Sequence, residues 1–139
     1  MKKLLTTCLG FVVIIVFSSC TGESSETLDK EFIKEKAEIG LSKSEVEEAF
    51  GKDYISGDAD GGKLWLYDTT NKEGANYERR LDAVAHEDII DGNVVNQLFI
   101  NFQKEKAIMY SFFYKGDDGK VWEFVLNPDE TTLEVPVSQ

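Results

Sequence analysis

Hydrophobic and polar residues alternate along four stretches in the middle and second half of the chain, and these stretches are rich in β-branched and aromatic residues. They are residues 63–68 (K-L-W-L-Y-D), 94–102, 106–114 and 120–126. Alternation with this composition is typical of β-strands. Only short links separate the last three stretches, and one of them contains Asp118-Gly119, a favourable pair for a tight turn. Because short links join antiparallel neighbours, the pattern predicts a β-meander of about four strands.

Helical spacing replaces this alternation near the start of the domain. Between residues 28 and 39, the apolar side chains of Leu28, Phe32, Ile33 and Ala37 recur close to one face of a helix. This spacing predicts a short amphipathic helix that packs against the sheet.

A second short helix is predicted within residues 39–51, which read I-G-L-S-K-S-E-V-E-E-A-F-G. Ser42 is a good N-cap, and Glu45 three residues later completes a capping box. Gly51 supplies the C-terminal stop. A helix of about eight residues does not persist alone, so its apolar stripe, which includes Val46 and Phe50, must dock on something larger.

Residues 75–91 are ambiguous. Leu81, Val84, Ala85 and Ile89 fit one face of a helix that Gly92-Asn93 would end, but a strand followed by a loop fits as well. With either choice, the predicted fold is α+β: two layers, in which short N-terminal helices pack on the antiparallel meander.

Alternation along the strands predicts which side chains share a face of the sheet. We expect Leu64 and Leu66 to face the helices together with Leu98, Ile100, Phe102, Trp122 and Phe124. The opposite face would then carry an apolar patch with a polar border, the kind of surface that binds partners. Its candidate partner-binding residues are Trp65, Tyr67, Phe99, Asn101 and Phe113. Two alternatives remain: residues 75–91 cover this face, or the assignment of faces is inverted.

The first residues predict export. A basic start at Lys2-Lys3 precedes an apolar run from Leu4 to Phe17, which is typical of a signal peptide. Val16-Phe17-Ser18-Ser19-Cys20 resembles the lipobox of bacterial lipoproteins, which implies cleavage before Cys20 and diacylglycerol on its thiol. The alternative is an ordinary signal peptide with a chance cysteine. The expected organisation is a signal peptide at 1–19, a lipidated tether at 20–27 and one α+β domain at 28–139. The location is then the extracytoplasmic face of the cell membrane, or the outer membrane in a Gram-negative cell.

Charge and residue types restrict the chemistry. The chain carries 15 Lys+Arg and 26 Asp+Glu, a net charge of −11, and without Lys2 and Lys3 the balance becomes −13. This disfavours nucleic acid and indicates either solubility or steering toward a basic partner. The two cysteines are Cys8, in the predicted signal, and Cys20, so no disulfide is expected in the domain. His86 is the only histidine, so we predict no metal site, no cofactor and no catalytic residues.

An acidic stretch, Asp58-x-Asp60-Gly61-Gly62, resembles the start of a calcium loop. The later positions do not fit that motif, because Gly62 and Lys63 stand where an oxygen ligand and a glycine are needed. We expect a plain acidic turn.

The capped helix at 39–51, followed by the L-W-L-Y strand and a meander, resembles a superfamily of small bacterial envelope lipoproteins. That superfamily contains the small lipoprotein of the β-barrel assembly machinery and the β-lactamase inhibitor protein. The resemblance implies a two-layer α+β fold that binds proteins and performs no chemistry. We therefore predict a lipid-anchored protein-binding module of the assembly, inhibitor or exclusion type. The alternative is a lipoprotein that binds a small ligand or cell-wall fragment, with Trp65 and Tyr67 stacking on sugar rings.

Overall fold

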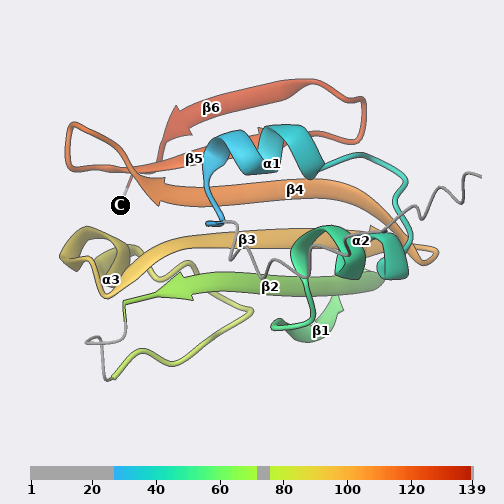
Figure 1. The fold of residues 1–139 in the computed structure, drawn as a ribbon, viewed down its shortest axis with the longest axis horizontal. Helices are drawn as coiled ribbons and strands as arrows, with labels where there is room; N and C mark the ends of the chain where they lie inside the picture. The colour runs from blue at the N-terminus through green and yellow to red at the C-terminus, as the bar shows by residue number, and fades with distance from the viewer. Residues whose placement is uncertain (1–26, 72–75, 139) are drawn as a thin grey trace, which may run out of the picture.

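One antiparallel sheet of six strands organises the residues that the structure describes. The structure is a computed structural model that describes residues 27–71 and 76–138. The strands neighbour one another in chain order (Figure 1): β1 (Ile55–Ala59), β2 (Gly62–Thr70), β3 (Val94–Gln103), β4 (Lys106–Lys115), β5 (Val121–Leu126) and β6 (Thr132–Pro136). The short helices are α1 (Lys30–Lys36), α2 (Lys43–Phe50) and α3 (His86–Asp91). The fold is therefore α+β with an antiparallel meander, but the expected count of about four strands is wrong.

The two additional strands lie at the edges of the sheet. β1 folds onto β2 through a two-residue turn, and both turn residues have positive φ angles, 44° for Asp60 and 81° for Gly61. An Asp-Gly pair is suited to this turn because glycine and aspartate tolerate such angles. The acidic stretch at 58–62 is thus the tip of a hairpin. At the other edge, β6 returns along β5 after a turn that begins at Asn127.

Helices α1 and α2 cover one face of the sheet (Figure 1). The predicted capping box of α2 is confirmed: Ser42 N donates to Glu45 Oε2 at 2.7 Å, and Glu45 N donates to Ser42 Oγ at 3.3 Å. The helix ends at Gly51, whose φ of 86° strongly favours glycine. Its Val46 side chain is fully buried, so the helix is held by the sheet as expected.

The opposite face of the sheet also carries a buried core. Leu66, Phe99 and Phe113 pack there beneath residues 76–91, which we call the strap. Only the last part of the strap is helical, as α3, and Gly92 ends that helix as predicted. Of the two alternatives for residues 75–91, a helix is right only for α3, and residues 76–85 form neither helix nor strand; residues 72–75 lie outside the described residues. The sheet is buried on both sides over β2 and β3.

Polar contacts hold the strap on the sheet. The buried Gln97 side chain of β3 accepts from Ala85 N and donates to the Tyr77 hydroxyl, both at 2.7 Å. Arg79 Nε lies 2.7 Å from Oδ1 of Asp68, whose side chain is fully buried, and the same guanidinium reaches exposed Asp53. Neither Asp68 oxygen has a well-aligned hydrogen-bond donor among the described residues, so the contact is an ion pair of imperfect geometry. Burial raises the pKa of Tyr77, and the Asp68 carboxylate raises it further.

Candidate functional site

The predicted partner-binding face does not exist as one surface. The side chains of Trp65 and Tyr67 are only 5% and 4% exposed and pack in the core beneath α1 and α2. Phe99 and Phe113, each 7% exposed, lie on the opposite face beneath the strap. Only Asn101 is partly exposed. Partner binding by this set stays a prediction, but its premise of a shared open aromatic face is wrong.

The register of the sheet explains the correction. Trp65 on β2 pairs with Ile100 on β3, and Leu66 pairs with Phe99, and paired residues share a face. The faces of β2 were therefore assigned the wrong way round relative to β3, and the strap covers part of the second face as well. Beyond the strap, the second face is more open: Leu133 on β6 is 52% exposed. Asn101, Met109 and Glu123 nearby are half-buried.

A groove of about 900 Å³ opens at the end of the sheet that carries α3. One wall is the start of α1, and the other is the turn between β4 and β5 at residues 115–118. Its floor includes Asn96, Phe112, Tyr114 and Trp122, which come from three neighbouring strands. Ligand sites in proteins have volumes of about 300–1,000 Å³, so the groove is large enough to hold a ligand or a peptide segment.

Tyr114 and Trp122 lie side by side on the floor, because they are cross-strand partners on β4 and β5. Lys30 Nζ sits 5.3 Å from the centroid of the Tyr114 ring and 2.8 Å from Glu134 Oε1. The Tyr114 hydroxyl also contacts this carboxylate. The hydrogen bond from Lys30, followed by that from Tyr114, lowers the pKa of Glu134. Lys30 Nζ also donates to the Tyr114 hydroxyl at 3.3 Å, so a cation of the chain already occupies the hydroxyl end of this ring.

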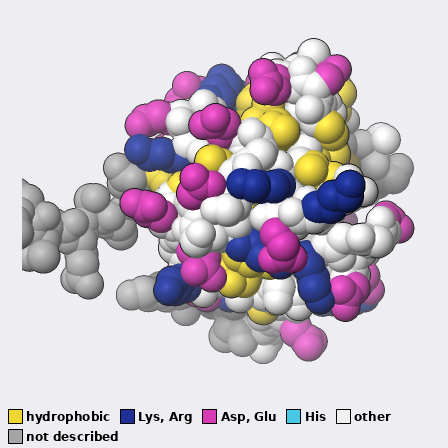
Figure 2. Space-filling model, turned by 90° about the vertical axis from the view of Figure 1, so that its right-hand side faces the viewer, with side chains coloured by type: hydrophobic (Ala, Val, Ile, Leu, Met, Phe, Trp, Pro, Cys, Tyr) yellow, Lys and Arg dark blue, Asp and Glu magenta, His cyan; other side chains and the backbone are white. Residues whose placement is uncertain are grey.

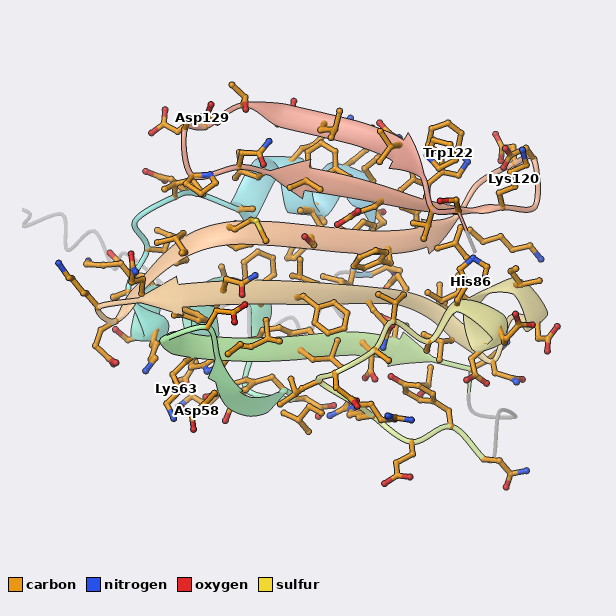
Figure 3. All side chains as sticks on the ribbon, turned by 180° about the vertical axis from the view of Figure 1, so that it is seen from behind. Asp58, Lys63, His86, Lys120, Trp122 and Asp129 are labelled. Carbon is orange, nitrogen blue, oxygen red and sulfur yellow. The ribbon has the colours of Figure 1, made fainter. Side chains whose placement is uncertain are left out.

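The Trp122 side chain is half-buried, and contacts along one edge of its ring hold it in place. Indole Nε1 donates to Asp118 Oδ1 at 3.1 Å, and a Cβ at Gly116 would lie only 2.6 Å from Trp122 Cδ1. The same Asp118 oxygen accepts from Lys120 N, and these bonds, Lys120 N first, lower the pKa of the carboxyl group. Figure 3 shows Trp122 and Lys120 together at this end of β5. The turn therefore holds both the ring and an ionised carboxylate in place.

Asn96 is the buried polar residue of the groove. Its side chain is 3% exposed, and Nδ2 donates to the Leu28 carbonyl next to α1. Oδ1 has no hydrogen-bond partner among the described residues. A buried unpaired acceptor costs about 1–3 kcal/mol, so a donor that reached Asn96 Oδ1 would be stabilising.

The lining of the groove is acidic. It contains five carboxylates, Asp29, Glu31, Asp117, Asp118 and Glu134, and two ammonium groups, Lys30 and Lys115, which leaves a net charge of −3. The opposite end of the molecule, which faces the reader in Figure 2, instead mixes acidic and basic side chains over its surface. Acidic side chains thus outnumber basic ones in the groove lining.

The groove offers contacts but no obvious reactive group. Across residues 27–71 and 76–138, no cluster of three or more His, Cys, Asp or Glu side chains is placed to hold a metal ion. His86 begins α3 outside the groove lining, in the region labelled in Figure 3. Sequence reasoning placed Trp122 only in the core. The available signal was its position next to a tight turn, where side chains are incompletely covered.

Comparisons of the chain with protein-family models, curated proteins and solved structures found no match. The resemblance to small envelope lipoproteins is tested by none of these comparisons and stays a prediction. Within the part of the chain that the structure describes, no helix is long and apolar enough to cross a membrane.

Proposed function

We propose that this chain is a lipid-anchored extracytoplasmic module that binds another protein by contact and catalyses no reaction. The observation that supports it best is the groove, an open and largely apolar trough with Tyr114 and Trp122 side by side on its floor. Half-buried aromatic side chains in a concave surface are typical centres of protein interfaces. The groove replaces the aromatic face of the sheet as the proposed contact site.

The shape of the groove favours a protein segment over a small molecule. Small-ligand sites bury most of the ligand surface, whereas this groove is open to solvent between α1 and the β4–β5 turn. A ligand or cell-wall fragment remains the second candidate, because Trp122 and the unpaired Asn96 Oδ1 would suit a sugar ring with hydroxyl donors.

The experiment is a pull-down from detergent-solubilised membranes with the full chain and two variants. Trp122→Ala removes the aromatic floor of the groove, whereas Leu133→Ala truncates an exposed apolar residue on the far face of the sheet. We expect a specific partner that Trp122→Ala loses and Leu133→Ala retains. Loss only with Leu133→Ala would move the contact to the sheet, and the absence of any specific protein would contradict the proposed function.

The lipid anchor is proposed from sequence, because residues 1–26, including Cys20, lie outside the described residues. The test is metabolic labelling with a radioactive fatty acid in cells that express the wild-type chain or Cys20→Ala. We expect label on the wild-type chain only and accumulation of uncut precursor in the variant. Normal cleavage and release of Cys20→Ala would refute the lipobox.

A further inference from the structure

We infer that the groove binds a Lys- or Arg-bearing segment of the partner protein, with the cationic side chain over the Trp122 ring and beside Asp118. The inference rests on the proposed protein-binding function and adds the chemistry of the partner. It is carried by the half-buried Trp122 ring, the excess of carboxylates over ammonium groups in the lining, and the unpaired acceptor of Asn96.

The two rings on the floor differ in one respect. Lys30 Nζ covers Tyr114 at 5.3 Å from the ring centroid, which lies within the distance of a cation–π interaction. Among the described residues, no lysine or arginine lies over the neighbouring Trp122 ring in this way. Indole is the strongest cation–π acceptor of the aromatic side chains, so the Trp122 ring can take a cation from a partner.

The carboxylates beside Trp122 can pair electrostatically with such a cation. Asp118 is held by Lys120 N and by the indole itself, so its orientation is fixed relative to the ring. Asp117 is exposed, and its side chain makes no ion pair or hydrogen bond within the described part of the chain. Of the nearby ammonium groups, Lys115 donates to the Ile90 carbonyl at 2.7 Å, and Lys120 belongs to the same turn outside the lining.

Asn96 provides an independent sign of a ligand that donates hydrogen bonds. Asn96 lines the groove, and its buried Oδ1 is an acceptor without a hydrogen-bond partner among the described residues. A guanidinium has five N–H donors and an ammonium has three, so either group can serve a carboxylate and an amide oxygen together. An anionic ligand would meet the net charge of −3 of the lining and leave this acceptor unpaired.

The test uses the full chain in detergent and three blocked peptides: Gly-Arg-Gly-Arg-Gly and its glutamine and glutamate counterparts. The chain contains two tryptophans, Trp65 and Trp122, and their indole N–H signals can be followed separately by NMR. We expect the arginine peptide to shift the Trp122 signal, with an affinity that falls as salt is added. The signal of buried Trp65 is the internal control and should stay in place.

Charge variants locate the contact. Asp118→Asn should weaken binding of the arginine peptide about two- to fivefold, and so should Asp117→Asn. Asp129→Asn is the matched control, because Asp129 also accepts from the backbone N–H two residues later but lies at the other end of β5 (Figure 3). It removes the same charge and should leave the affinity unchanged within about twofold. For variants without the indole, binding is followed by the backbone amide signals of the turn at 115–118; Trp122→Leu should weaken binding about tenfold or more, and Trp122→Phe less.

Any of the following outcomes would overturn the inference. Equal weakening by Asp129→Asn would show unspecific attraction to an acidic protein. Equal binding of the glutamine peptide, or a Trp122 shift caused only by a neutral cell-wall oligosaccharide, would assign the groove to an uncharged ligand. No response to the arginine peptide would reject a basic partner. If membrane pull-downs still yield a protein that Trp122→Ala loses, the proposed function stands while the inference fails.

Discussion

The attachment of the strap to the sheet should depend on the ion pair between Arg79 and Asp68 more than on any exposed ion pair. Asp68 is on β2 with its side chain fully buried, and Arg79 Nε lies 2.7 Å from its Oδ1. Arg79→Met keeps an unbranched stem of similar packing but removes the guanidinium, which leaves the carboxylate without a cation. We therefore expect a large loss of stability from a substitution that disturbs little volume.

The magnitude follows from burial. Removing one partner of a fully buried ion pair costs about 3–5 kcal/mol. The Arg79 side chain is 28% exposed, so water screens part of the interaction and we expect a loss of about 2–3 kcal/mol. For a domain of this size, such a loss lowers the midpoint of thermal unfolding by about 10 °C.

Arg80→Met is the control, because the adjacent Arg80 also pairs with an aspartate, Asp82, but both side chains are more than half exposed. It changes the net charge equally and should leave the urea midpoint nearly unchanged, because water screens an exposed pair. The double variant Asp68→Asn/Arg79→Met removes the stranded charge and should recover about 1–2 kcal/mol relative to Arg79→Met.

The assay is urea unfolding of the full chain in mild detergent, followed by circular dichroism and tryptophan fluorescence. The free energy of unfolding of each variant is compared with that of the wild-type chain. If Arg79→Met and Arg80→Met agree within about 0.5 kcal/mol, the buried pair does not hold the strap. The same conclusion follows if the double variant is no more stable than Arg79→Met.

Three further predictions concern other parts of the fold. Ser42→Ala removes the N-cap of α2 and should lower the free energy of unfolding by about 1 kcal/mol in the same urea assay. Gly62→Ala should lower it by about 3 kcal/mol, since the new Cβ would lie 2.0 Å from the Phe102 carbonyl oxygen and force the backbone to move. The Asp118 carboxyl has a depressed pKa, so the stability it adds is present above the ordinary value of 3.8 and is lost as pH falls through the depressed pKa. The Trp122 indole N–H signal should therefore titrate with a midpoint below 3.8, and Asp118→Asn should abolish that transition.

Signals that depend on a few neighbouring residues predicted their elements well. The capping box of α2, its glycine stop and the four strands with long alternating patterns are all present. Ile55–Ala59 lacked such a signal, because Gly57 and Asp58 are weak strand formers. This strand forms because the Asp60-Gly61 turn folds it onto β2, so the turn was the better predictor.

Assigning faces of the sheet needed information that one strand does not contain. Alternation places Trp65 and Leu66 on opposite sides, but only the pairing with Ile100 decides which of them meets the helices. The run L-W-L-Y at 64–67 did carry a usable signal, since four consecutive apolar residues indicate burial on both faces. Read in this way, most strand aromatics are needed for two cores. An aromatic residue available for binding is then expected where the sheet ends and its cover stops, and there Trp122 lies half-buried beside the β4–β5 turn.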